Sequence, residues 1–167
     1  MTVTTFPDRL RATRRTAFHL EMRDSYTPND PTYLSWKRDE PIDAMEVYRP
    51  WLDLVRDAVG RGVAVRRARI VSEPVSDYIR FEHSVTPMNL AAGEEVRWLT
   101  RRRASNIALP GNDFWILDNE LVRFGHFSGE GDVLGEEWTE DPAVVKLCAS
   151  AFDAVWARAV PHQEYKI

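Results

Sequence analysis

Six charged side chains are the best candidates for chemistry in this sequence, because they lie in, beside or just after the strands predicted from residue 63 onward. They are Glu73, Asp77, Arg80, Arg97, Asp113 and Asp118. In sheets flanked by helices, ligands bind beyond the carboxyl ends of the strands. Carboxylates at such a place could act as general acid or base, and an arginine could hold an anion with its planar fork. The set predicts a pocket for a small anionic ligand.

The same charges also fit a structural interpretation, an ion-pair network that fixes a helix against the sheet. Its members would be Glu73 or Glu82 on one side and Arg69, Arg80 or Arg97 on the other. The strand predicted over residues 63–71, VAVRRARIV, carries three arginines and needs acidic partners in order to fold. We therefore favour the network over the pocket.

Common catalytic and metal-binding patterns are missing from the sequence. The four histidines show no HxxxH or HxH spacing, and the single cysteine, Cys148, offers no thiolate pair for zinc. His83 and Ser84 are neighbours in a predicted helix, so they point in different directions and cannot belong to one catalytic triad. We predict no metal site, no cofactor and no catalytic residue of these kinds.

Composition indicates one domain with a sizeable core. The chain has 167 residues, 44% of them hydrophobic, with six tryptophans, five tyrosines and seven phenylalanines. No apolar run approaches the roughly 20 residues that span a bilayer, and the N-terminus has no signal-peptide core. We expect a cytoplasmic protein without membrane contact. Its single domain covers residues 1–167, with an N-terminal part over 1–44 and an α/β core over 45–167.

The charge balance argues against nucleic-acid binding. The net charge is −4, although 19 of the 22 basic residues are arginines. Arginine clusters at residues 9–15, 66–69 and 101–103 could touch phosphates, but a nucleic-acid domain usually carries a basic net charge as well. Arginine-mediated nucleic-acid binding is therefore the third of our functional hypotheses.

The order of predicted elements sets the fold class. Strands are expected over residues 17–23, 63–71, 95–100, 114–117, 121–127 and 133–139. Helices are expected over residues 6–15, 45–60, 75–92 with a break at Thr86-Pro87, and 141–159. The turn dipeptide Asp118-Asn119 makes Gly111 to Phe127 a β-hairpin near the centre of the sheet. The sum is an α/β (α+β) fold with a mixed, mostly antiparallel sheet flanked by helices.

Within the first predicted strand, residues 17–23, apolar and polar side chains alternate. Phe18, Leu20 and Met22 fall on one face, and His19, Glu21 and Arg23 fall on the other.

Residues 25–44, rich in proline, aspartate and asparagine, are expected to be a mobile loop with one helical turn near residues 33–37. The loop holds Tyr26, Tyr33 and Trp36. These aromatic side chains could anchor a partner protein, or the loop could fold back and cover the sheet. Both alternatives stay open on the sequence alone.

Four sequence motifs resemble an actinobacterial family of domains of unknown function. They are RARIVSEPVSDYIRFE at residues 67–82, NLAAGEEVRWL at 89–99, DFWILD at 113–118 and the ending DAVWARAVPHQEY. The resemblance extends from about Phe6 to Tyr165. Members of that family tend to be encoded beside helix-turn-helix regulators, which implies a regulatory or conflict-system role and such a regulator as partner.

From Val63 onward the element order is also similar to phospholipase-D-like domains, including degenerate ones that serve as sensor modules in regulators. Phospholipase D chemistry requires the pattern HxKxxxxD, with a nucleophilic histidine and a phosphate-binding lysine. If Asp118 takes the aspartate position, Gly111 and Asp113 stand where the histidine and lysine are needed. The sequence HFSGEGD after His126 has serine for lysine and the wrong spacing. Phosphodiester hydrolysis by that mechanism is therefore not expected.

Two main functional hypotheses remain. The first is a non-enzymatic regulatory module that binds a partner protein and holds a small ligand. The second is a hydrolase or transferase that acts on a nucleotide-like or other anionic substrate, with Glu73 or Asp118 as an acid or base. The second hypothesis predicts that two or more of Glu73, Asp113 and Asp118 converge on an open cleft.

Overall fold

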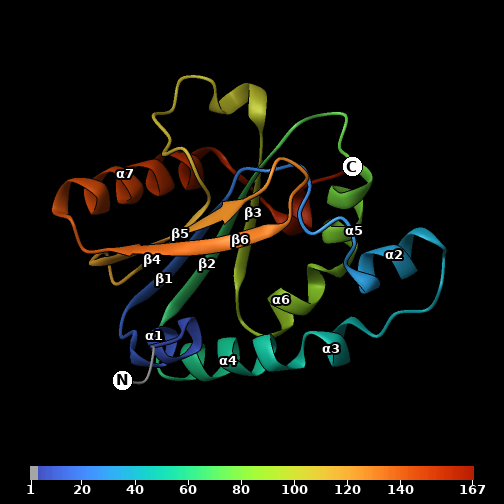
Figure 1. The fold of residues 1–167 in the computed structure, drawn as a ribbon, viewed down its shortest axis with the longest axis horizontal. Coiled ribbons are helices and arrows are strands. Elements are labelled where there is room, and N and C mark those ends of the chain that lie inside the picture. Colours follow the sequence, from blue (N-terminus) through green and yellow to red (C-terminus); the bar gives the residue numbers. More distant parts are fainter. Residues whose placement is uncertain (1–3) are drawn as a thin grey trace.

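A mixed sheet forms the centre of the computed structural model, which describes residues 4–167 (Figure 1). Within these residues seven strands pair in the order β6-β5-β4-β1-β2-β3-β7. The strands are β1 (Thr16–Glu21), β2 (Ala64–Val71), β3 (Glu95–Thr100), β4 (Phe114–Leu117), β5 (Leu121–Phe127), β6 (Val133–Thr139) and β7 (Val160–Pro161). Strands β1, β2 and β3 run parallel, and the other four join them antiparallel. The predicted mixed, mostly antiparallel sheet is confirmed.

Helices cover both faces of the sheet. They are α1 (Phe6–Ala12), α2 (Pro31–Lys37), α3 (Ala44–Val47), α4 (Arg49–Gly60), α5 (Asp77–Val85), α6 (Pro87–Ala91) and α7 (Pro142–Arg158), with 3₁₀ turns at Arg101–Ala104 and His162–Glu164. Helix α7 lies alone on one face, and α1, α4 and α6 lie on the other (Figure 1). None of the helices in residues 4–167 is both long and apolar enough to cross a membrane.

The alternation predicted in the first strand is confirmed by the way β1 is packed. Phe18 and Leu20 join the core under α7, where Phe18 stacks on Phe152 at 4.7 Å. Ala17 joins the core on the opposite face, beneath α4. The strand ends at Glu21, two residues earlier than predicted. His19 and Glu21 therefore point away from α7, toward the face that α4, α5 and α6 cover.

Two predicted helix boundaries are confirmed with their physical cause. The Asp141 side chain accepts a hydrogen bond from the Ala143 backbone N–H at 2.8 Å, and Pro142 occupies the first helical position of α7. Pro87 separates α5 from α6, and Thr86 between them is fully buried. The Thr86 hydroxyl donates to the Glu82 carbonyl at 2.6 Å. The break thus places a buried hydroxyl at the end of α5.

The helical turn predicted near residues 33–37 is present as helix α2, which begins two residues earlier, at Pro31. Its N-cap Asp30 accepts a hydrogen bond from the Tyr33 N–H at 3.0 Å. The pair Asp30-Pro31 is the same start signal as Asp141-Pro142. The continuous helix predicted over residues 45–60 is wrong, because α3 ends at Val47 and α4 begins at Arg49. Tyr48, at this junction, points into the interior described below.

The β4–β5 hairpin is confirmed near the centre of the sheet, between β1 and β6. Its turn residues Asp118 and Asn119 have φ angles of 53° and 56°. Positive φ at both central positions is typical of a type I′ turn, which asparagine and aspartate tolerate better than most residues.

Candidate functional site

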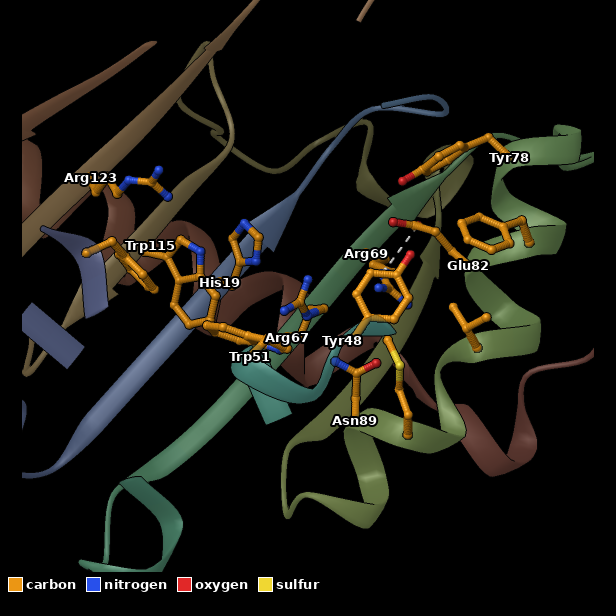
Figure 2. Close-up of a pocket in the computed structure, with 14 residues that line it drawn as sticks. His19, Tyr48, Trp51, Arg67, Arg69, Tyr78, Glu82, Asn89, Trp115 and Arg123 are labelled. Carbon is orange, nitrogen blue, oxygen red and sulfur yellow. Dashed lines mark ion pairs between the residues drawn. The ribbon is translucent and has the colours of Figure 1, made fainter. Parts of the chain in front are cut away.

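A cavity of about 390 Å³ lies between the sheet and helices α4, α5 and α6 (Figure 2). Aromatic side chains, three arginines and a few other polar groups line it. A second cavity of about 270 Å³ adjoins the first and is bordered by β5 and β6. The two cavities share His19, Glu82, Trp115 and Arg123. They form the candidate site, which we call the central cavity.

Strand pairing explains the polar floor of the central cavity. In the parallel β1–β2 register, His19 lies opposite Arg67 and Glu21 lies opposite Arg69. Side chains two residues apart in a strand share a face, so all four point to the same side of the sheet. The alternation that buries Phe18 and Leu20 under α7 therefore also gathers these charges under the other helices.

The floor is a network of buried ion pairs. Arg67 donates to Glu21 and, at 2.6 Å, to Glu94, which itself accepts from the Asn89 amide at 2.7 Å. Arg69 donates from Nε to Glu21 at 3.3 Å and from Nη1 to the Thr86 hydroxyl at 2.6 Å. Both guanidinium groups are thus held by buried acceptors.

Aromatic rings hold the polar groups from the side. His19 stacks on Trp115, with ring centroids 4.3 Å apart and planes 15° apart. The Arg67 guanidinium lies 5.8 Å from the centroid of Trp51 and 5.7 Å from that of Trp115. Arg69 lies 4.8 Å over Trp98. In Figure 2, Trp115, His19 and Arg123 stand at one end of the cavity, and Tyr78 and Glu82 at the other.

Two buried polar atoms in the central cavity have no hydrogen-bond partner among the described residues: Nδ1 of His19 and Oε2 of Glu82. His19 Nδ1 lies 3.4 Å from a Glu21 oxygen, and Glu82 Oε2 lies 3.4 Å from Arg69 Nε. Neither contact has the directionality of a hydrogen bond, and Arg69 Nε donates instead to Glu21. A buried polar atom without a partner is costly, so these two positions call for an explanation.

Burial and the arginines set the protonation of these groups. Burial raises the pKa of Glu82 to about 8; Arg69 opposes this shift, and the Glu21 carboxylate adds to it. Burial alone would raise the pKa of Glu21, but Arg69 and Arg67 outweigh it and hold that pKa well below its usual range. Burial and Arg67 hold the pKa of His19 well below 6.5. Burial therefore favours the neutral forms of Glu82 and His19, whereas the two arginines favour the ionised form of Glu21.

Of the six residues predicted to form a pocket, Asp113 lines the central cavity. It accepts hydrogen bonds from the Tyr26 hydroxyl and from the Met22 backbone N–H, the latter at 2.9 Å. Burial raises the pKa of Asp113 to about 6, although the Tyr26 hydrogen bond acts against this shift.

The other five predicted residues lie elsewhere. Asp118 accepts hydrogen bonds from the backbone N–H groups of residues 14–16, at 2.7 to 3.0 Å, and so fixes the start of β1. Arg97 donates to the Trp156 carbonyl at 3.0 Å on the α7 face. Glu73 is exposed and accepts from Tyr165 at 3.2 Å; Asp77 and Arg80 are exposed on α5. The convergence of Glu73, Asp113 and Asp118 that the enzyme hypothesis requires does not occur.

Of the pairs predicted for the ion-pair network we favoured, Arg69 and Glu82 lie 3.4 Å apart, but burial favours the protonated form of Glu82, and the arginine donates to Glu21 instead. Glu73, Arg80 and Arg97 form no ion pair within residues 4–167. Sequence reasoning missed His19, Glu21 and Glu94, which complete the network. The signal was available for His19 and Glu21, because their face of β1 was predicted correctly, but nothing in the sequence placed that face under a cavity.

The three aromatic residues predicted to contact a partner pack against α5. Tyr33 lies 5.1 Å from Tyr78 and 5.5 Å from Phe81, and Trp36 lies 5.9 Å from Phe81. Tyr26 and Tyr33 are buried, whereas Trp36 is partly exposed. This is the arrangement of a segment that folds back over the domain. Across residues 4–167 no group of three or more histidine, cysteine or acidic side chains could hold a metal ion.

Comparison with protein families gives one match over the described chain. A family model for a domain of unknown function, DUF6879, matches residues 4–167. No curated protein matches the sequence.

Three solved structures share the fold at low sequence identity. NucT from Helicobacter pylori has a TM-score of 0.54 at 14% identity, over 93% of this chain and 87% of its own. Nuc from Salmonella typhimurium, a phospholipase D family member, has a TM-score of 0.53 at 13% identity, over 96% of this chain and 88% of its own. TrmBL2, an archaeal chromatin protein that binds DNA, has a TM-score of 0.51 at 15% identity. That match covers 92% of this chain and 48% of TrmBL2, so the chain spans about half the length of TrmBL2. The phospholipase-D-like fold is confirmed.

Proposed function

This chain belongs to the DUF6879 family of domains of unknown function, and we propose that it is a non-enzymatic regulatory module that binds a small ligand in the central cavity. A volume of about 390 Å³ is in the range of natural small-molecule sites. The mixture of aromatic walls with a few fixed polar groups is typical of such sites as well.

The observation that carries the proposal is the pair of unsatisfied atoms, Glu82 Oε2 and His19 Nδ1. Each is held in place by its surroundings: His19 by its stack on Trp115, and Glu82 by helix α5. A ligand that hydrogen bonds to both would remove a desolvation cost of about 1–3 kcal/mol at each atom. Binding would then recover free energy that the unliganded fold has lost.

Two features support binding without phosphodiester chemistry. Among the described residues that line the central cavity there is no serine, threonine, cysteine or lysine, so its histidine, His19, lacks the lysine that phospholipase D chemistry also requires. In addition, Gly111 and Asp113 occupy the positions where phospholipase D chemistry requires histidine and lysine, if Asp118 takes the place of the aspartate. The scaffold would thus serve recognition alone.

A ligand screen with a matched pair of variants tests the proposal. A library of neutral, cationic and anionic small molecules is screened by thermal shift, and hits are confirmed by calorimetry. Val85→Trp adds a large ring to a residue that lines the cavity, and Leu147→Trp adds the same ring on the exposed side of α7. We expect hits that Val85→Trp abolishes and Leu147→Trp retains. Hits that bind equally to both variants, or no hits at all, would count against a cavity ligand.

The regulatory part of the proposal requires a partner protein, and we propose a helix-turn-helix regulator encoded nearby. TrmBL2, a DNA-binding protein, is about twice as long as the matching region, so a fold of this kind can be joined to further protein. Trp36 is the partly exposed aromatic residue of the α2 segment and our candidate for the contact. A pulldown from the native host should recover a DNA-binding protein with wild-type protein and less of it with Trp36→Ala. Recovery of no such protein would contradict this part.

A hydrolase or transferase is the second candidate, and one observation favours it. Glu82 and Asp113, with pKa values raised to about 8 and about 6, border the same cavity, and perturbed carboxyl groups are frequent in active sites. In this case Asp113→Asn and Glu82→Gln would each abolish turnover of a bound compound. Hits that stay chemically unchanged after long incubation with wild-type protein would favour the non-enzymatic module.

A further inference from the structure

We infer that the ligand of the central cavity is a flat organic cation that carries N–H donors, and that its binding expels the proton of Glu82. This inference rests on the proposed ligand-binding function and names the chemical class of the ligand. It differs from the anionic ligand expected from the arginine content, and the difference comes from where the arginines are used.

The three arginines around the cavity already have partners. Arg67 is held by Glu21 and Glu94, and Arg69 by Glu21 and the Thr86 hydroxyl. Arg123, the third arginine of the cavity, is paired with Glu136. With Glu82 protonated, three guanidinium groups face these three carboxylates, and Asp113, which also borders the cavity, adds a further acidic group. An anion would find these arginines engaged and would add an uncompensated charge to a buried site.

Once Glu82 loses the proton with which it hydrogen bonds to Glu21, its Oε2 can accept from a donor of the ligand. The residue is 8% exposed, and its Oε2 receives no hydrogen bond. An amidinium, guanidinium or protonated heteroaromatic ring supplies N–H donors and a positive charge at once. Hydrogen bonds between such groups and a carboxylate are among the strongest in proteins. A cationic ligand would therefore stabilise the ionised form of Glu82, and the proton would leave to solvent.

The walls around Glu82 favour the same class of ligand. Tyr48, Tyr78 and Phe81 line the cavity together with Glu82, and Figure 2 places Tyr48 and Tyr78 near its carboxyl group. The face of an aromatic ring carries partial negative charge and attracts cations. Flat rings also stack favourably on other rings. The geometry thus combines an acidic group with several aromatic surfaces.

His19, toward the other end of the cavity, is the second group that could change its protonation when a ligand binds. An anionic ligand could bind if His19 took up a proton, because the imidazolium would compensate the added charge. Burial and Arg67 hold the pKa of His19 well below its usual value, whereas that of Glu82 lies only about one unit above neutral pH. Losing the Glu82 proton is therefore the easier adjustment. The charged and titratable groups nearest to Glu82 are Glu21, Arg67, Arg69, Tyr26, Tyr48 and Tyr78.

Three probes of nearly equal size and shape test the inference: benzamidine is a cation, benzamide is neutral and benzoate is an anion. Calorimetry at about pH 7 in buffers of different ionisation enthalpy measures affinity and the protons released together. We expect benzamidine to bind most tightly and to release close to one proton. Its affinity should rise by up to about tenfold per pH unit until the pKa of Glu82, about 8, and then level off.

Two variants isolate the role of Glu82. Glu82→Gln keeps the shape of the protonated side chain but cannot ionise; it should abolish the proton release and weaken benzamidine by at least about tenfold, with benzamide little changed. Glu120→Gln, at an exposed glutamate outside the cavity, should change neither quantity.

The outcomes separate this inference from the proposed function. If benzoate binds more tightly than benzamidine, or benzamidine binds without proton release, the inference is wrong and the cavity still binds a ligand. If none of the three probes binds, the inference is overturned. The proposed function survives that result if the wider screen yields a ligand whose binding Val85→Trp abolishes. It fails as well if the screen yields no such ligand.

Discussion

Replacing Glu82 with glutamine should stabilise the protein at alkaline pH. The folded state raises the pKa of Glu82 from 4.5 to about 8, chiefly through burial. Between these two values the folded protein keeps a proton that the unfolded chain has lost. Its free energy of unfolding therefore falls as the pH rises from about 4.5 to about 8. Glu82→Gln mimics the protonated form at every pH and removes this loss.

The magnitude follows from the shift. One pKa unit corresponds to about 1.4 kcal/mol, so the advantage of the variant grows from near zero at about pH 4 to at most roughly 5 kcal/mol at about pH 9. An ion-pair interpretation predicts the opposite sign. If Glu82 were ionised and stabilised by Arg69, its removal would cost about 3–5 kcal/mol at neutral pH.

Urea unfolding of the wild type and Glu82→Gln between about pH 4 and pH 9 measures the difference, which cancels the titration of groups that do not interact with Glu82. Glu120→Gln is the control, because that side chain is 73% exposed and pairs with the exposed Arg15. Its effect should stay within about 1 kcal/mol at every pH. A variant of Glu82 that is destabilised throughout, or a difference that does not grow with pH, would refute the reasoning.

Three further predictions concern the rest of the fold. Glu21→Gln should lower the free energy of unfolding by about 3–5 kcal/mol, because Glu21 compensates two buried guanidinium groups. The exposed control Glu120→Gln should lower it by less than about 1 kcal/mol. Equal losses of the two variants in urea unfolding would contradict the buried network. Asp118→Ala should cost about 1–3 kcal/mol by urea unfolding, since three backbone N–H groups lose their acceptor. Burial opposes the shift, but those N–H groups hold the Asp118 pKa below 3.8. The wild type should therefore lose the stability that the Asp118 carboxylate contributes as the pH falls below 3.8 and the group takes up a proton. A difference between wild type and Asp118→Ala that persists at lower pH would contradict this role of the carboxylate. The Cys148 thiol, whose pKa burial raises to about 11, should react with a thiol reagent only as fast as the protein opens; rapid labelling of native protein at neutral pH would show otherwise.

The sheet and most of its helices follow from local signals in the sequence. Alternation in β1, the turn at Asp118-Asn119 and the start of α7 at Asp141-Pro142 each depend on a few neighbouring residues, and each was predicted correctly. The same local logic applied to Asp30-Pro31 would have placed the start of α2 at Pro31 rather than near residue 33. The short pairing of β7 with β3 could not be predicted, because two residues give no periodicity.

The central cavity depends on long-range register, which a single sequence does not specify. His19 and Glu21 meet Arg67 and Arg69 because β1 and β2 pair in parallel with one particular offset. Glu94 reaches Arg67 from the turn after α6, 27 residues away. The prediction placed ligand chemistry at the carboxyl ends of strands, whereas the unsatisfied groups lie over the face of the sheet. Of the predicted residues, Asp113 borders this site because it precedes β4 beside β1.

The most direct test of ligand binding in the central cavity uses the tryptophan indole N–H signals in NMR spectra. Trp51 and Trp115 line the cavity, whereas Trp156 is part of α7 and stacks on Phe152 on the opposite face of the sheet. During titration with benzamidine or a confirmed screening hit, the signals of Trp51 and Trp115 should shift together and saturate, while that of Trp156 stays in place. A titration that leaves Trp51 and Trp115 unchanged, or moves Trp156 equally, would contradict a ligand site in this cavity.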